Sequence, residues 1–523
     1  MRRMLSATAI LATFVVLTVR AQDDSQAVVN AAAQALGAAT LTSLQYSGSG
    51  TIDTFGQNWK NDVPWPEFKL TTYTVNVDYS IPAMQAQLTR DNPERGKPMQ
   101  GGGFPLFALQ NLHHVVSGRL AWNVDGENAT PALAAVNDRL LELWSTPHGI
   151  IKAAQAAGAK VKVETVKNSG GEPTGATTLT FPMMNTTFKV NVTKEHLVSR
   201  AEYQTDTPML GDTTHVMLYS NYQDFGGIKF PSRIAHVEGE NPLFKLDGFP
   251  VMTLTVNKVT PNAKVPEGPQ NVQQAAAAAP PPPPAVKVDK IAEGVYVLSG
   301  QGANSVAVEF NDHVVLIEAP QNDALAMARF EAIRKMIPNK PVRYVINTHH
   351  HFDHAGGLRA AVAEGATIIS HGLNQQFYEK VVQLPHTLNP DRLAKEPKKA
   401  NIEYVGTVFG AGREERELTD GKRKLEIYRV AGSQHADAML IGYLPAEKIL
   451  VEADLFTPQA APVAIAARPP EAGAGAGGGR LIVNPEPRNL YNNIQRLKLQ
   501  VETIAPLHGS LVKMAELLKL LGV

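Results

Sequence analysis

The chain of 523 residues contains no cysteine. Without thiols it can have no disulfide framework, no thiolate nucleophile, no cysteine-ligated zinc or iron–sulfur site and no lipid-modified cysteine anchor. Any metal ion must therefore be held by histidine, aspartate or glutamate side chains.

An excess of charge of either sign is also missing. The 49 lysine and arginine residues are balanced by 49 aspartate and glutamate residues. Nucleic-acid binders and polybasic membrane adaptors need a field of one sign, so we expect no nucleic-acid partner. With 44% hydrophobic and 19% charged residues, the chain should fold, and its length predicts about two to four domains.

The first residues are typical of a signal peptide. Arg2 and Arg3 precede an apolar run over about residues 5–19, and a small-residue cleavage site ends at Ala21. As a helix the run would be only about 22 Å long, which is short of the ~30 Å hydrocarbon core, so a retained membrane anchor is disfavoured. We therefore predict a signal peptide over residues 1–21, no stable membrane anchor after its cleavage, and a periplasmic or secreted product.

A run of five alanines and five prolines over residues 275–284 marks a domain boundary. Consecutive prolines favour an extended, semi-rigid spacer, about 15 Å long for five residues. We therefore predict a linker over residues 266–285 between an N-terminal domain, residues 22–265, and a C-terminal domain, residues 286–523.

The two domains differ in hydrophobic pattern. The N-terminal part alternates with the period of strands over residues 70–77, 187–192, 216–220 and 252–256, with helices expected near residues 131–143 and 149–157. This predicts a mostly antiparallel β (α+β) domain, whose role the sequence leaves unknown. Residues 222–233 resemble hairpins in envelope proteins of the lipoprotein-carrier type.

The C-terminal part instead alternates strands with helices. Strands are expected over residues 295–298, 305–310, 314–317, 342–346 and 366–370, and helices over 323–336 and 357–364. This order predicts a layered α/β domain.

Directly after the strand expected to end at residue 346, the chain reads Asn347-Thr-His-His-His-Phe-Asp-His-Ala-Gly-Gly357. Alternate residues of an extended segment share a face, so His349 and His351 can meet one metal ion while His350 points away. A turn would then bring Asp353 and His354 towards a second ion. The alternative is a solvent-washed histidine cluster without a metal.

This H-x-H-x-D-H string resembles the signature of the metallo-β-lactamase superfamily. The superfamily's later ligands have counterparts in order: His435 before an apolar strand, Asp454 at a strand end, and His508 near the C-terminus. The resemblance covers residues 286–523 and implies an αββα sandwich with the site at one edge of the paired sheets.

The resemblance also implies the ligand set and the chemistry. The first metal would be bound by His349, His351 and His435. The second would be bound by Asp353, His354 and His508, with Asp454 bridging the two ions. Two Zn²⁺ ions are expected, with iron or manganese as alternatives, and a shared hydroxide would attack the substrate while the catalytic Asp353 orients it.

Substrate and supporting residues stay open at this point. Glu318 stands where the superfamily usually has aspartate, and could support the histidine loop or be a salt-bridged or exposed glutamate. Thr457 stands where true β-lactamases often carry lysine, which argues against β-lactams. We predict an exported metal-dependent hydrolase of a small ester, lactone, thioester or amide. The alternative is an envelope ligand-binding protein whose metal domain has no significant catalysis.

Overall fold

The computed structural model describes residues 25–92, 100–102, 109–126, 128–238, 249–264, 284–407, 414–458 and 484–523. The predicted signal peptide, nearly all of the predicted linker and the glycine-rich segment 460–480 lie outside the described residues. Within the described ranges, no helix is long and apolar enough to cross a membrane.

The N-terminal domain is built on one antiparallel sheet of 13 strands, in the order β6-β5-β4-β3-β2-β1-β13-β12-β11-β10-β9-β8-β7. The strands are β1 (Ser43–Asp53), β2 (Glu67–Asp78), β3 (Ala83–Asp91), β4 (Gln110–Ser117), β5 (Leu120–Asp125), β6 (Asn128–Pro131), β7 (Lys162–Lys167), β8 (Pro173–Met183), β9 (Thr186–Val192), β10 (Val198–Thr207), β11 (Gly211–Asp224), β12 (Lys229–Glu238) and β13 (Phe249–Pro261). All four predicted strands are present, and β11 and β12 form the predicted hairpin. The predicted β-rich fold class is confirmed.

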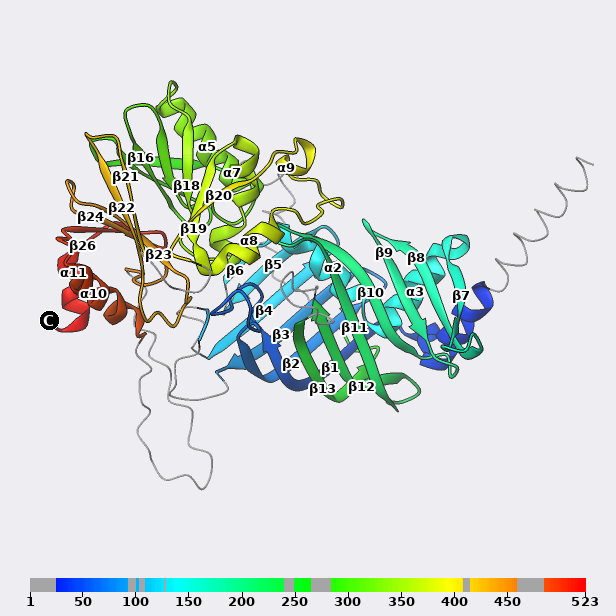
Figure 1. Cartoon of the computed structure of the whole chain (residues 1–523). Coiled ribbons are helices and arrows are strands. Elements are labelled where there is room, and N and C mark those ends of the chain that lie inside the picture. Colours follow the sequence, from blue (N-terminus) through cyan, green and yellow to red (C-terminus); the bar gives the residue numbers. More distant parts are fainter. Residues whose placement is uncertain are drawn as a thin grey trace, which may run out of the picture.

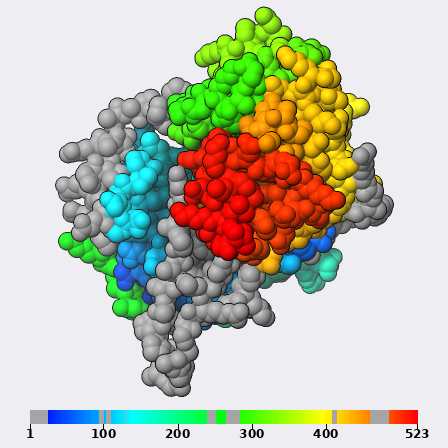
Figure 2. Space-filling model, turned by 90° about the vertical axis from the view of Figure 1, so that its left-hand side faces the viewer, coloured from blue at the N-terminus to red at the C-terminus, as the bar shows by residue number. Residues whose placement is uncertain are grey.

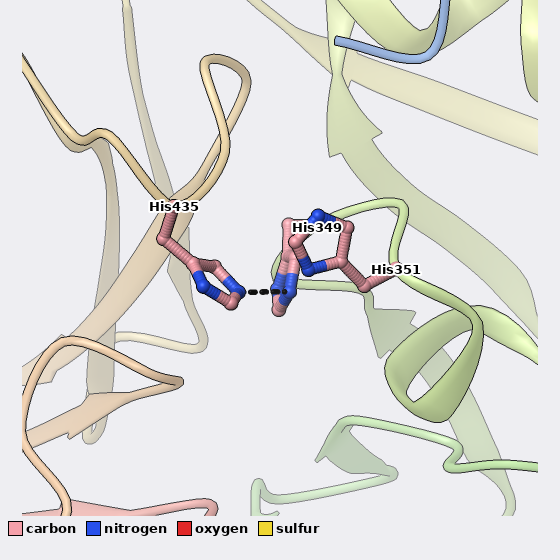
Figure 3. A group of neighbouring side chains, drawn as sticks. All are labelled: His349, His351 and His435. Atoms are coloured by element: carbon pink, nitrogen blue, oxygen red, sulfur yellow. Dashed lines mark hydrogen bonds between the residues drawn. The ribbon is translucent and has the colours of Figure 1, made fainter. Parts of the chain in front are cut away.

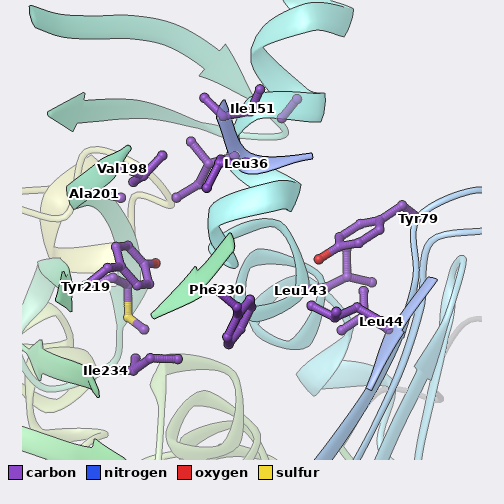
Figure 4. Packing of buried hydrophobic residues seen from close by; sticks show 14 of the residues in the cluster. Leu36, Leu44, Tyr79, Leu143, Ile151, Val198, Ala201, Tyr219, Phe230 and Ile234 are labelled. Atoms are coloured by element: carbon purple, nitrogen blue, oxygen red, sulfur yellow. The ribbon is translucent and has the colours of Figure 1, made fainter. Parts of the chain in front are cut away.

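Helices cover one face of this sheet and bury its apolar side chains (Figure 1). They are the helical residues 25–36, α2 (Val136–Trp144) and α3 (Pro147–Ala157), with short 3₁₀ turns η1 (Ala38–Thr40), η2 (Leu133–Ala135) and η3 (Gly158–Lys160). Figure 4 shows Leu36 and Leu143 from the helical layer packed in one core with Phe230 of the sheet.

For both helices predicted in the N-terminal domain, the predicted first residue was wrong. The first helix begins at Val136 rather than near residue 131, because residues 128–131 pair with β5 as a short strand. The second helix begins earlier than residue 149, because Thr146 caps it by accepting from the Gly149 amide and Pro147 occupies the first turn.

The C-terminal domain contains two sheets. The first has the order β14-β15-β16-β17-β18-β19-β20, and the second runs from β21 to β26. Their strands are β14 (Val286–Ala292), β15 (Val295–Gly300), β16 (Ser305–Glu309), β17 (Val314–Ile317), β18 (Val342–Ile346), β19 (Thr367–His371), β20 (Asn401–Val405), β21 (Glu415–Thr419), β22 (Lys424–Arg429), β23 (Leu440–Leu444), β24 (Ile449–Glu452), β25 (Thr503–Pro506) and β26 (Val512–Lys513).

Helices lie outside both sheets. They are α5 (Asp323–Met336), α6 (Phe352–Ala355), α7 (Leu358–Glu364), η4 (Gly372–Asn374), α8 (Gln375–Val381), α9 (Arg392–Lys395), α10 (Glu486–Leu497) and α11 (Met514–Leu521). In β17, Val315 and Ile317 face the second sheet, whereas Leu316 packs with α5 and α7. This alternation gives the predicted αββα sandwich. In the space-filling view, α10 and α11 (orange to red) form an outer face of the molecule (Figure 2).

The two domains contact each other directly. Met209 and Leu210 of the N-terminal domain belong to the same apolar cluster as α5 and α7. The carboxylate of Asp212 accepts hydrogen bonds from the Thr387 and Leu388 amides at 2.9–3.1 Å. A second contact, made by residues 54–66, reaches the site described next.

Candidate metal centre

The predicted ligands come from the ends of strands that share a direction. Strand β17 is parallel to β18, and β24 is parallel to β25. Carboxyl ends of parallel strands meet at one edge of a sheet, where α/β folds place their sites. The 349–354 segment follows β18, Asp454 follows β24 and His508 follows β25. His435 lies in the loop between β22 and β23 and reaches the same edge.

The first cluster consists of His349, His351 and His435. Each offers a ligand atom, and the three atoms lie within 4.8 Å of one another. The Nε2 atoms of His349 and His435 are 3.0 Å apart. Figure 3 shows His435 facing His349 and His351 from the opposite side of the centre. All three side chains are buried.

The second cluster consists of Asp353, His354 and His508, whose ligand atoms also lie within 4.8 Å of one another. Asp454 stands between the two clusters. Its Oδ2 is 2.8 Å from His354 Nε2 and 3.5 Å from His435 Nε2, and its Oδ1 is 3.5 Å from His508 Nε2. The structure therefore brings all seven predicted ligands together, with Asp454 in the bridging position.

Glu318 fixes the tautomers of two of these histidines. It is fully buried; its Oε2 accepts from the Thr348 hydroxyl at 2.5 Å and from His354 Nδ1 at 3.0 Å. Because the Thr348 hydroxyl proton is committed to Glu318, its oxygen accepts from His349 Nδ1 at 3.0 Å. His349 therefore presents an Nε2 lone pair to the centre, and His354 points its Nε2 there as well, 2.8 Å from Asp454 Oδ2. The supporting role that the sequence left open for Glu318 is the one its contacts fit.

The N-terminal domain fixes the tautomer of a third histidine, His351. The Asn58 carbonyl accepts from His351 Nε2 at 2.9 Å and from His350 Nε2 at 2.8 Å. His351 Nδ1 is then a buried lone pair without a hydrogen-bond partner. Ligating imidazoles typically donate their other ring N–H to a carbonyl or carboxylate in this way. The converging lone pairs fit a bound cation.

Electrostatics sets the protonation of the centre when no metal is bound. Burial would lower the pKa of His354 and His508, but the negative charges of Asp353 and Asp454 outweigh it and raise both pKa values, so a cation would displace a proton from each ring. Burial and the neighbouring imidazoles lower the pKa of His349, so this ring is neutral. Burial would raise the pKa of Asp454, but the charges of His435 and His354 outweigh it and lower that pKa. The pKa of Asp353 is lowered in the same way by His354 and by a hydrogen bond from His508. Both carboxylates are therefore anionic and can bind divalent metal ions.

The β1–β2 loop, residues 54–66, lies against the centre. Gln57 Nε2 donates to Asp353 Oδ1 at 2.9 Å, and the ring of Phe55 meets that of Phe352 edge-on, with centroids 5.0 Å apart. Trp59 exchanges hydrogen bonds with the His435 loop: its Nε1 donates to the Ser433 carbonyl at 3.0 Å, and its carbonyl accepts from the Asp437 amide at 2.9 Å. The loop thus forms part of the wall of the site.

Three neighbouring polar residues lie outside the two clusters. His350 turns to Asn58, as its alternation predicted, and Asp437 holds the β1–β2 loop and Arg429. His371 accepts from the Leu373 amide and caps η4. Sequence reasoning missed the β1–β2 loop as part of the site, because its contacts join residues almost 300 positions apart.

Comparisons with known proteins agree with this architecture. Residues 298–458 match the family model described as the Metallo-beta-lactamase superfamily. A segment of 76 residues is 34% identical to the alkyl/aryl-sulfatase BDS1 of Saccharomyces cerevisiae, over 14% of this chain. The chain thus matches only 12% of that relative's length.

Among solved structures, a metallo-beta-lactamase from Pontibacter korlensis is 19% identical, with 46% of this chain and 98% of that chain covered and a TM-score of 0.33. The metallo-beta-lactamase FIM-1 from Pseudomonas aeruginosa, in its mono-zinc form, is 18% identical, with 46% and 94% covered and a TM-score of 0.31. From its two-sheet architecture and the family match, the C-terminal part of the chain is a metallo-β-lactamase superfamily domain.

Proposed function

We propose that the protein is a metal-dependent hydrolase that uses two divalent ions, with zinc as the expected metal, to cleave a small ester, lactone, thioester or amide. The observation that carries the proposal is the convergence of seven imidazole and carboxylate side chains. Three of the imidazoles, those of His349, His351 and His354, are oriented by hydrogen bonds on the ring nitrogen that faces away from the centre. When bound, the ions would supply Lewis acidity and a water of lowered pKa.

The chain's own residues would hold and orient the reactants. Asp353 and His508 are the most accessible of the ligands, with side chains 33% and 30% exposed, so substrate approaches from their side. Asp353 Oδ2 lies 3.5 Å from the Nε2 atoms of His354 and His508 and would be the metal-binding oxygen. Asp353 Oδ1, which Gln57 holds, would then orient a water molecule and accept its proton. No serine or cysteine nucleophile is required.

The substrate range is the open part of the proposal. The 76-residue similarity to an alkyl/aryl-sulfatase adds sulfate esters to the candidate substrates. Thr457, where true β-lactamases often carry a lysine, makes β-lactams the weakest candidates.

The test is turnover by the purified, zinc-loaded full-length chain. Ester, lactone, thioester, amide, sulfate ester, phosphodiester and β-lactam probes would be compared between the wild type and His351→Ala or Asp353→Ala. We expect the active probe to lose more than ~100-fold in kcat/KM, because ligand loss exceeds the loss of a supporting group. The exposed His196 supplies the control, His196→Ala, which should keep full activity.

Equal turnover by the wild type and both ligand variants would refute the hydrolase proposal. Zinc binding without turnover of any probe would favour the alternative, a ligand-binding protein whose metal domain has no significant catalysis.

A further inference from the structure

A second imidazole–carboxylate cluster lies in the N-terminal domain and shares no residue with the C-terminal centre. It consists of His215 on β11 with His236 and Glu238 on β12, here called the N-terminal triad. In the antiparallel pairing, His215 lies opposite Glu238, and Met217 lies opposite His236. Since alternate strand residues share a face, all three side chains project from the same side of the sheet.

The distances within the triad suit one metal ion. His215 Nδ1 lies 3.0 Å from His236 Nε2 and 3.4 Å from Glu238 Oε1, and His236 Nε2 lies 3.7 Å from the same oxygen. Ligands about 2.0–2.2 Å from a zinc ion are separated by distances of this order. The three side chains are only 10, 18 and 14% exposed.

Neighbouring strands hold His215 in the required orientation. Thr205 Oγ1 on β10 lies 2.7 Å from His215 Nε2. With His215 Nε2–H donating to this hydroxyl, Nδ1 presents its lone pair to the other two members. The ring also stacks on Tyr203 with centroids 4.9 Å apart and an interplanar angle of 4°.

Charged groups of both signs line the cavity next to the triad. They are the carboxyl groups of Asp138, Glu142 and Asp206 and the guanidinium groups of Arg90 and Arg139. Glu238 is the carboxylate that belongs to the triad itself.

The triad forms part of the wall of a cavity of about 440 Å³ between the sheet and α2. The remaining wall is largely apolar, with side chains that include Ile52, Leu88, Leu112, Ile234 and Met252. Three protein ligands leave coordination positions open, which is the arrangement of catalytic and ligand-binding metal sites rather than closed structural ones.

We infer that the N-terminal triad binds one divalent transition-metal ion of the zinc or iron(II) class. Its open positions face the cavity and would accept an oxygen donor of a small, mainly apolar molecule. This site is separate from the C-terminal centre, and the inference does not depend on the proposed hydrolase activity.

The test uses the full-length chain with the C-terminal centre disabled by His349→Ala, His435→Ala, Asp353→Ala and His508→Ala, which leaves one member of each of its two clusters. This chain would be titrated with Co²⁺, whose visible absorption reports ligation by imidazole and carboxylate, and its zinc content would be measured after dialysis. We expect about one Co²⁺ per chain in the titration and, in the separate zinc measurement, about one Zn²⁺ per chain. Adding either His236→Gln or Glu238→Gln should remove both signals, whereas adding His196→Ala should leave them unchanged.

Two results would overturn the inference. The first is the absence of Co²⁺ absorption in the chain that keeps the triad intact, which would make the triad a hydrogen-bonded cluster only. The second is absorption that persists in folded chains carrying His236→Gln or Glu238→Gln. The first result needs no substitution in the N-terminal domain, so it stands even if those variants do not fold.

Discussion

The C-terminal centre and the N-terminal triad use the same two kinds of side chain but assemble them differently. The C-terminal centre gathers seven side chains from loops that follow strands of two sheets. The N-terminal triad takes three side chains from two paired strands, through the register of one hairpin. Loops that follow strands can concentrate ligands in one short stretch, so the first site leaves a sequence motif. A site assembled by the pairing of two strands leaves no motif in the sequence, only an ordinary alternation such as His236-Val-Glu238.

The largest effect should come from the support behind the C-terminal centre. Replacing Glu318 with alanine removes the acceptor that orients His349, through Thr348, and His354 directly. We expect zinc affinity to fall by about 10- to 100-fold, the usual effect of losing a supporting group. Competition with a chelator of known affinity would measure it.

A matched Glu318→Gln variant keeps the size of the side chain and one carbonyl acceptor, so its loss should be smaller. Unchanged zinc affinity in Glu318→Ala would show that the two histidines hold their orientation without this carboxylate.

A smaller effect should come from the β1–β2 loop. Gly56 has φ +71°, and a Cβ at this position would lie 2.4–2.9 Å from ring atoms of Phe352. Gly56→Ala should push the loop away and weaken the contacts that Asn58 and Gln57 make with the centre. We expect about a tenfold loss in zinc affinity or kcat/KM.

Gly118→Ala is the matched control, because Gly118 has φ +57° and an added Cβ there meets no atom within 4 Å. Both variants carry the backbone strain, but only one carries the clash. If they behave alike, the loop does not act on the centre.

The smallest effect should come from the support behind the N-terminal triad. Thr205→Val keeps the shape of the side chain but removes the hydroxyl that orients His215. In the chain with a disabled C-terminal centre, we expect Co²⁺ affinity to fall by up to about tenfold. Thr205→Ser, which keeps the hydroxyl, should lose less. Equal affinities in the two variants would mean that strand pairing and the stacking of Tyr203 suffice to orient the ring.

Sequence patterns predicted best where local signals and tertiary structure agree. Helix α5 spans the predicted 323–336, because Asn322 caps it by accepting from the Leu325 amide. Strand β18 spans the predicted 342–346, a short apolar run between turns. A helix was predicted to begin near residue 131, but residues 128–131 form a strand and the helix begins at Val136, because β5 supplies pairing that propensity cannot show.

The candidate centre divides in the same way. Its seven ligands could be proposed from spacing and resemblance, and their ligation of metal stays a prediction. The residues that orient these ligands were harder to predict. The sequence left the role of Glu318 open, and the contact of Asn58 with His351 joins residues 293 positions apart. No local pattern encodes a contact of that separation.

The Asn58 contact also limits what conventional mutagenesis can detect. The acceptor is a main-chain oxygen, which every amino acid carries, so replacing the side chain at this position does not remove it. An alanine at this position would instead remove the buried side-chain amide, which donates to the Lys60 and Val63 carbonyls within the loop at 2.5 and 3.1 Å. Only changes that alter the length or path of the loop would expose how far one domain depends on the other.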